Sequence, residues 1–383
     1  KFPEIANDNV AVTAMVYQLM MSTADIAINT NGLPYAVRKQ GAGLANLDNA
    51  LATTGYITTK DKNGNVMDKT KIELGDDPNK TGQYTLNFTI NNFGDTELTY
   101  KLGAYVMTEG VSDTLTNAGE TTVTEQGHIL DGAKIDVTNV AGGTLKDGKI
   151  SVKPGENADV TVVITLSDAD KAYLNDSFKN GMYVEGYITL TAEKGTKVNL
   201  SVPYLAFYGD WTKAPLFDLE YFDTNKDELD DGISVEDKLM ADAYPTRPVG
   251  GVSEDYVSYL GSYYFLQDPK DMVIPSNRDH ISLSNQDGTI HSLRYVWAGL
   301  LRNAAKVDIT IKDKTTGEVI FQTTDTDVRK SYGDGGSIYP ANIEIEFDTL
   351  DYNFANNTEL EVLLEGYLDY GTDGGKASNE KNT

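Results

Sequence analysis

Apolar residues near the start of the chain recur with the period of an α-helix. Val12, Met15, Val16, Leu19 and Met20 stand at positions i, i+3, i+4, i+7 and i+8. Residues at this spacing share one face of a helix. The pattern therefore predicts a helix in this region that is buried along that face.

A tight turn and a second, shorter helix are predicted further along. Gly41 and Gly43 flank an alanine, and glycine reaches positive φ without steric cost, which favours a compact turn. Asn46 or Asp48 then offers a side-chain oxygen that can cap the first turn of a helix. The apolar residues that this helix is expected to bury are Leu47, Ala50 and Leu51.

From about Gly55 onward the apolar period changes from that of helices to that of strands. Leu86, Phe88 and Ile90 alternate with polar residues, which is typical of a half-buried strand. A similar run over 98–106 predicts the second strand of a hairpin. Further strands are predicted over 148–152, 159–166, 182–192, 197–207 and 359–367. Short strands at this spacing indicate antiparallel β-sandwiches.

The chain has 23 tyrosines. On a half-buried strand a tyrosine can pack its ring while its hydroxyl group stays in water. We therefore expect the tyrosines to be strand-face residues with solvated hydroxyl groups. A tyrosine platform that binds carbohydrate is the alternative.

Composition narrows the classes of partner. The chain of 383 residues is long enough for two or three domains, and its formal net charge is −26. Such a surface repels polyanions, which argues against nucleic acid and anionic lipid as partners. There is no cysteine for a disulfide or thiolate metal site, and no apolar run of about 18 residues for membrane insertion.

An acidic segment between the predicted sandwiches offers a candidate calcium site. Oxygen donors at alternate positions of a tight loop suit a hard cation such as Ca²⁺. The expected ligands are the side chains of Asp223, Asn225, Asp227 and Asp231, with the main-chain carbonyl of Leu229. The loop lacks a glycine at Glu228 and a bidentate carboxylate at Ser234. A solvated acidic linker that binds no metal is the alternative.

Two groups of motifs resemble one protein family. The run R-K-Q-G-A-G-L from Arg38 resembles the closing stretch of the catalytic domain in subtilisin-like serine proteases of the cell-envelope type, the lactocepin and C5a-peptidase group. N-G-M-Y-V-E-G-Y from Asn180 and P-Y-L-A-F-Y-G-D-W from Pro203 resemble the first fibronectin-type-III-like domain of that family. L-R-N-A-A-K from Leu301 resembles part of the second.

The resemblance implies a mainly β fold, in which tandem antiparallel fibronectin-type-III-like β-sandwiches follow the short helical tail of an α/β subtilisin-like catalytic domain. That tail is expected over residues 1–54. The first sandwich is expected over 55–211, an acidic connecting segment over 212–270, and a second, truncated sandwich over 271–383.

The chain is expected to carry no catalytic residue of its own. The family's nucleophile motif, G-T-S-M-A-x-P, is not in the sequence, and His128, His280 and His291 lack the sequence context of the family's general base. The resemblance implies a parent that is a secreted or cell-wall-associated serine endopeptidase of a Gram-positive bacterium. Its partners would be its own catalytic domain and, through the parent, protein or peptide substrates. A non-enzymatic surface adhesin or interaction module is the alternative.

Overall fold

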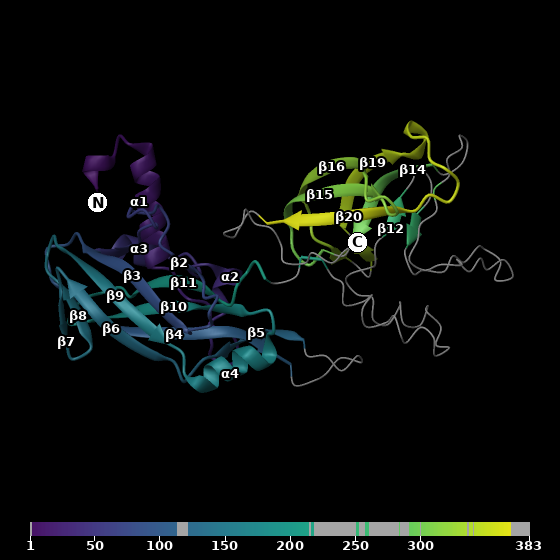
Figure 1. Cartoon of the computed structure of the whole chain (residues 1–383). Helices are drawn as coiled ribbons and strands as arrows, with labels where there is room; N and C mark the ends of the chain where they lie inside the picture. The colour runs from purple at the N-terminus through teal and green to yellow at the C-terminus, as the bar shows by residue number, and fades with distance from the viewer. Residues whose placement is uncertain are drawn as a thin grey trace. The chain divides into compact units, whose positions relative to one another are not determined.

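The chain forms two compact units, residues 1–211 and 212–383, in the computed structural model (Figure 1). The structure describes residues 2–112, 122–213, 216–217, 250–252, 257–259, 283, 291–298, 300–334, 337–339 and 341–368. No helix in these ranges is long and apolar enough to cross a membrane.

The first unit begins with short helices, as predicted. They are η1 (Pro3–Ile5), α1 (Asn9–Ser22), α2 (Val37–Gln40) and α3 (Leu47–Ala52). Asp8 caps α1 by accepting from the main-chain N–H groups of Val10 and Ala11. Asn46 caps α3 by accepting from the N–H of Asn49, so Asn46 rather than Asp48 supplies the cap.

The helices bury less apolar surface than the sequence pattern predicts. Val16 of α1 is 50% exposed, and Leu47 and Leu51 of α3 are 63% and 64% exposed. The expectation that α3 buries both leucines is therefore wrong. The helix is short and packs against α1, and only Ala50 is buried.

The remainder of the first unit is a β-sandwich of two sheets. One sheet has the order β1 (Gly55–Thr58), β3 (Gln83–Asn92), β9 (Asn157–Thr165), β6 (Lys134–Ala141). The other has the order β2 (Ile72–Asp76), β11 (Leu200–Tyr208), β10 (Met182–Glu193), β4 (Leu98–Val111), β8 (Lys149–Val152), β7 (Thr144–Lys146), with β5 (Val123–Ile129) paired to β4. These pairings are antiparallel except that β2 runs parallel to β11.

Strands β3 and β4 do not form the predicted hairpin. Both edges of β3 are occupied, one by β1 and the other by β9. The chain therefore crosses to the opposite sheet after Asn92, and β4 pairs with β10 and β8. A further element, α4 (Asp168–Ser177), was not predicted, although Ser167 and Asp170 form a capping box at its start.

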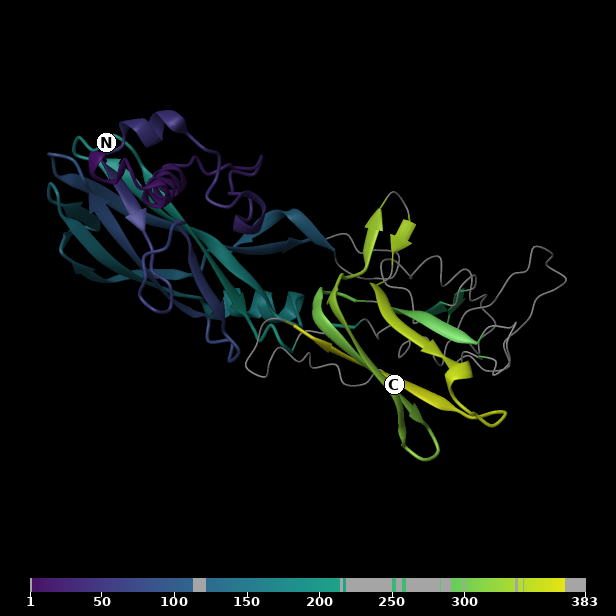
Figure 2. The ribbon, with the colours of Figure 1, turned by 90° about the horizontal axis from the view of Figure 1, so that it is seen from above.

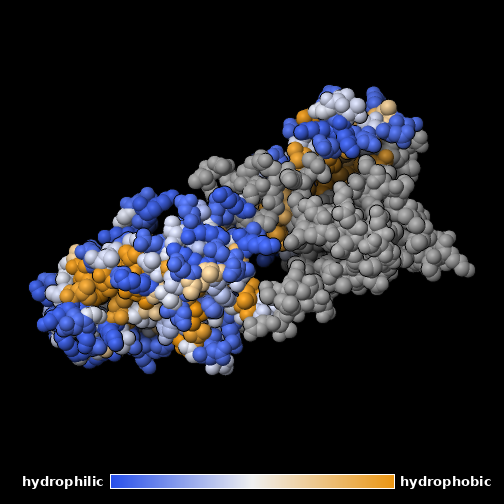
Figure 3. Space-filling view, turned by 60° about the horizontal axis from the view of Figure 1, so that its bottom comes forward, coloured by the Kyte–Doolittle hydropathy of each residue, from blue (hydrophilic) through white to orange (hydrophobic). Residues whose placement is uncertain are grey.

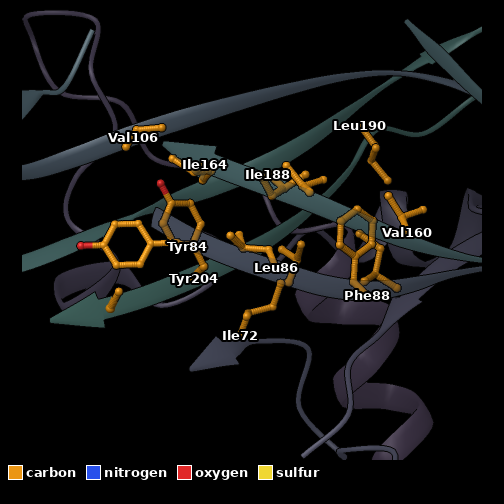
Figure 4. Close-up of a cluster of buried hydrophobic side chains, with 14 of the residues drawn as sticks. Ile72, Tyr84, Leu86, Phe88, Val106, Val160, Ile164, Ile188, Leu190 and Tyr204 are labelled. Carbon is orange, nitrogen blue, oxygen red and sulfur yellow. The ribbon is translucent and has the colours of Figure 1, made fainter. Parts of the chain in front are cut away.

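The core lies between the two sheets, where β3 supplies Leu86, Phe88 and Ile90, as its alternating pattern predicts (Figure 4). The expectation that the tyrosines hold their hydroxyl groups in water is wrong for the buried tyrosines of this unit. The buried tyrosines are Tyr84, Tyr100, Tyr187, Tyr204 and Tyr208. Burial raises the pKa of Tyr84 and of Tyr100, and among the described residues neither hydroxyl has a hydrogen-bond partner.

The second unit is also built of strands. One sheet has the order β13 (Val257–Tyr259), β12 (Gly250–Val252), β14 (Ser292–Ala298), β19 (Ala341–Asp348), and another the order β16 (Val319–Val328), β15 (Ala304–Asp313), β20 (Leu360–Tyr367). Strands β17 (Tyr332–Asp334) and β18 (Ser337–Tyr339) form a pair, and η3 (Thr349–Asp351) follows β19. Val307, Ile309 and Ile343 are among its buried residues. The expected calcium ligands, 223–231, lie outside the described residues.

Candidate interface between the N-terminal segment and the first sandwich

The N-terminal segment, residues 2–54, covers the outer face of the larger sheet. Helix α1 contacts β1 and β11, and α2 contacts β10 and β11 (Figure 2). Nearly every residue of β11 is buried, so this strand is covered on both faces. This cover explains why Tyr187 is buried with its hydroxyl bonded to Gly41, whereas Tyr100, Tyr204 and Tyr208 are buried because they belong to the core between the two sheets.

Three residues at alternate positions of β10 point toward that cover. They are Tyr183, Glu185 and Tyr187, and side chains two residues apart lie on the same face of a strand. Each of them contacts the stretch from Arg38 to Gly41. The motif around Tyr183 and the motif that begins at Arg38 therefore form the two sides of one interface.

Glu185 is the most enclosed charge in the interface, with its side chain 2% exposed. Its Oε1 accepts from Nε and Nη2 of Arg38, both at 3.0 Å. Its Oε2 accepts from the main-chain N–H of Arg38 at 3.1 Å. That N–H lies in the first turn of α2, where the N-cap residue Ala36 provides no side-chain acceptor. Glu185 thus supplies an acceptor that the helix itself lacks.

A second carboxylate faces the same guanidinium. Glu109 on β4, whose side chain is 10% exposed, forms an ion pair with Nη2 of Arg38. The guanidinium also lies over the ring of Tyr183, 4.3 Å from the ring centroid. Burial acts to lower the pKa of Arg38, but the two carboxylates outweigh it, and the pKa is raised above its ordinary value. Arg38 is therefore charged at neutral pH.

The adjoining loop is fixed by hydrogen bonds. The hydroxyl of Tyr187 donates to the carbonyl of Gly41 at 2.8 Å. The side chain of Gln40 accepts from the N–H of Ala27 at 2.8 Å and donates to the carbonyls of Ala27 and Tyr35 at 3.1 and 2.7 Å. Arg38 and Gly41 of the R-K-Q-G run thus contact the sandwich, while Gln40 forms its hydrogen bonds with other residues of the N-terminal segment.

Two glycines permit close main-chain contacts on either side of the interface, Gly43 within the N-terminal segment and Gly186 within the sandwich. Gly43 has φ of 119°, and a Cβ built there would lie 2.4 Å from the carbonyl oxygen of Asp25. Gly186, between Glu185 and Tyr187, would place a Cβ 1.9 Å from the carbonyl oxygen of Tyr105.

Helix α1 provides a separate attachment. The Ser22 hydroxyl is fully buried; it accepts from the N–H of Ile57 at 2.9 Å and donates to the carbonyl of Gln18 at 2.6 Å. The side chain of Gln18 donates to the carbonyl of Met67 at 3.0 Å. The segment is therefore tied to the sandwich through both α1 and the loop around α2.

The described histidines have structural contacts. His128 stacks on Tyr173, with ring centroids 3.7 Å apart. Nδ1 of His291 lies 2.9 Å from Oδ1 of Asp348. In the described part of the chain neither ring is hydrogen-bonded to a serine or threonine hydroxyl, the contact that would activate a nucleophile. His280 lies outside the described residues.

Comparison with known proteins places these features in a family context. A family model described as an Fn3-like domain matches residues 72–205, from β2 into β11. A PII-type proteinase of Lacticaseibacillus paracasei is 26% identical over 328 residues, which cover 84% of this chain and 15% of that protein. A PI-type proteinase of Lactococcus lactis subsp. cremoris is 26% identical over 332 residues, with the same two shares. A C5a peptidase of Streptococcus pyogenes serotype M1 is 25% identical over 231 residues, 56% of this chain and 17% of that protein.

The chain is a homologue of the cell-envelope proteinases. The resemblance expected from its motifs is confirmed, and so is the mainly β class with a fibronectin-like domain and short N-terminal helices. The chain spans about 15% of the length of the PI- and PII-type relatives that it matches.

Within this proteinase homologue, the motif residues are now assigned to contacts that sequence reasoning did not find. Glu185 and Glu109 were not singled out as functional, although a glutamate in the middle of a buried strand is a signal in itself, since a buried carboxylate needs a partner. Arg38 was noted only as part of a motif. Its two carboxylate partners lie 71 and 147 residues away in sequence, so spacing alone could not identify them.

Proposed function

We propose that the chain is the non-catalytic part of a secreted or cell-wall-associated subtilisin-like serine endopeptidase, and that it braces the catalytic domain and shapes the access of protein substrates. The supporting observation is the interface at Arg38. It fixes the N-terminal segment, the proposed tail of the catalytic domain, to the outer face of a rigid sandwich.

The N-terminal segment exposes several large apolar side chains to solvent. Val10, Leu44, Leu47 and Leu51 are 74%, 66%, 63% and 64% exposed. Figure 3 shows apolar patches among polar side chains on one face of the first unit. We propose that the catalytic domain of the parent covers the leucines of the N-terminal segment, so that the segment lies between that domain and the sandwich.

The brace is tested in the complete proteinase with Arg38→Ala. Loss of the ion pairs should loosen the tail and shorten the half-life of activity at elevated temperature several-fold, because thermal inactivation follows the unfolding rate. Peptide kcat/KM at 25 °C should stay within about twofold, because every step of the chemistry takes place elsewhere. The control is Lys39→Ala, which removes an exposed neighbouring cation. Equal half-lives for all three proteins would refute the brace.

We predict that the isolated chain does not hydrolyse protein. Incubation with casein or a fluorogenic peptide library should give no turnover that a serine-directed fluorophosphonate abolishes. Covalent labelling of any serine in this chain by that reagent would contradict the prediction.

We also propose that one Ca²⁺ ion binds the loop that contains Asp223, Asn225, Asp227 and Asp231, with the carbonyl of Leu229. Binding to the folded state alone stabilises it by RT ln(1 + [L]/Kd), about 2.7 kcal/mol at a hundredfold excess over Kd. The melting temperature should therefore rise between chelator and several millimolar CaCl₂, and Asp227→Ala should abolish the rise. An unchanged melting temperature in the wild-type chain would leave the loop as a solvated linker.

A further inference from the structure

We propose that Glu109, Glu185 and the ring of Tyr183 form a guanidinium-binding socket on the outer face of the first sandwich. Arg38 occupies this socket in the folded chain. The socket selects arginine over lysine at this position, and it accepts a free guanidinium cation when the Arg38 side chain is removed. The inference concerns the chain itself and does not depend on the proposed protease role.

The socket is built on rigid elements. Its carboxylates come from neighbouring strands, since Glu185 pairs with Met107 of β4, two residues before Glu109. Next to Glu185, the main chain at Gly186 lies close to the carbonyl of Tyr105 on β4. Because both carboxylates are attached to paired strands, they should stay in place when the Arg38 side chain is removed. A binding site needs side chains that are held in this way.

The donors and acceptors match a planar cation. Nε and Nη2 of Arg38 both donate to Glu185, Nη2 also pairs with Glu109, and the plane lies over the Tyr183 ring at 4.3 Å. Guanidinium presents several fixed N–H groups and stacks well on aromatic rings. An ammonium group is a compact point charge, so it matches the two carboxylates less well and stacks less well on the ring.

The electrostatics also favour an occupant. The cluster holds two carboxylates and one guanidinium, and in the described part of the chain no other lysine or arginine forms an ion pair with Glu109 or Glu185. Without Arg38, two enclosed carboxylates would face each other without a cation. The Arg38 side chain is 30% exposed, so the space that it leaves is reached from solvent.

The test is chemical rescue of the intact chain carrying Arg38→Ala. The melting temperature of this variant should lie below that of the wild type. If methylguanidinium binds with a Kd of about 1 mM, a concentration about ten times the Kd should raise the melting temperature by roughly 3 °C, and the rise should level off as the site fills. Methylammonium chloride at equal ionic strength is the control salt, and the wild-type chain is the control protein. Adding Glu185→Gln to the variant should abolish the rise.

Several outcomes would overturn the proposal. They are no rise in Arg38→Ala, an equal rise with methylammonium, or an equal rise in the wild-type chain. If Arg38→Ala does not fold, Arg38→Lys gives the decision. A melting temperature below the wild-type value supports a guanidinium-specific socket, while a melting temperature equal to it shows that any cation suffices.

Discussion

Replacing Gly186 by alanine is expected to lower the free energy of unfolding of the first unit by about 3 kcal/mol. A Cβ there would lie 1.9 Å from the carbonyl oxygen of Tyr105 and 3.0 Å from the hydroxyl of Tyr204. The first of these atoms belongs to the main chain of a paired strand, so relief requires β4 and β10 to move apart. Urea unfolding followed by tryptophan or tyrosine fluorescence measures the loss.

The matched control is Gly103→Ala, in the neighbouring strand β4. A Cβ at Gly103 meets only the hydroxyl of Thr189, at 2.9 Å, and a threonine side chain can rotate away. Its cost should stay below about 1 kcal/mol. Equal losses for the two variants would show that the contact with Tyr105 is not what requires glycine at position 186.

Tyr187→Ala is expected to cost about 4 kcal/mol, because it empties a fully buried position and removes the bond to the carbonyl of Gly41. Tyr187→Phe keeps the ring and removes only the hydroxyl, so it should cost about 1 kcal/mol. The same urea titration compares both. A loss for Tyr187→Phe as large as that for Tyr187→Ala would mean that the hydrogen bond, and not packing, dominates this contact.

Local sequence patterns correctly predicted elements in which one face is buried or one side chain caps a helix. The alternation of Leu86, Phe88 and Ile90 identified β3, because one face of that strand meets the core and the polar residues between them are mostly more exposed. The polar residues at the start of α3 predicted a cap at Asn46 or Asp48, and Asn46 supplies it. The cap of α3 is a contact within three residues, and the alternation along β3 indicates which face is buried without indicating what it packs against.

The pattern failed where a distant segment covers a surface. Tyr187 was expected to hold its hydroxyl in water, yet the loop at Gly41 covers it. Leu47 and Leu51 were expected to be buried, yet α3 packs against α1 in a way that leaves both side chains exposed. The pairing of Arg38 with Glu109 and Glu185 was not predicted either, because it depends on which strands lie side by side.

Hydrogen exchange tests most directly whether the sandwich holds the N-terminal segment through Glu185. In the intact chain, Glu185→Ala should speed amide exchange over residues 25–44 by roughly tenfold or more, while residues 84–90 of β3 exchange as in the wild type. The control is Glu193→Ala on the same strand, which removes an ion pair with Lys149 remote from Arg38. Unchanged exchange over 25–44 in Glu185→Ala would contradict the account, because the segment would then be held without this interface.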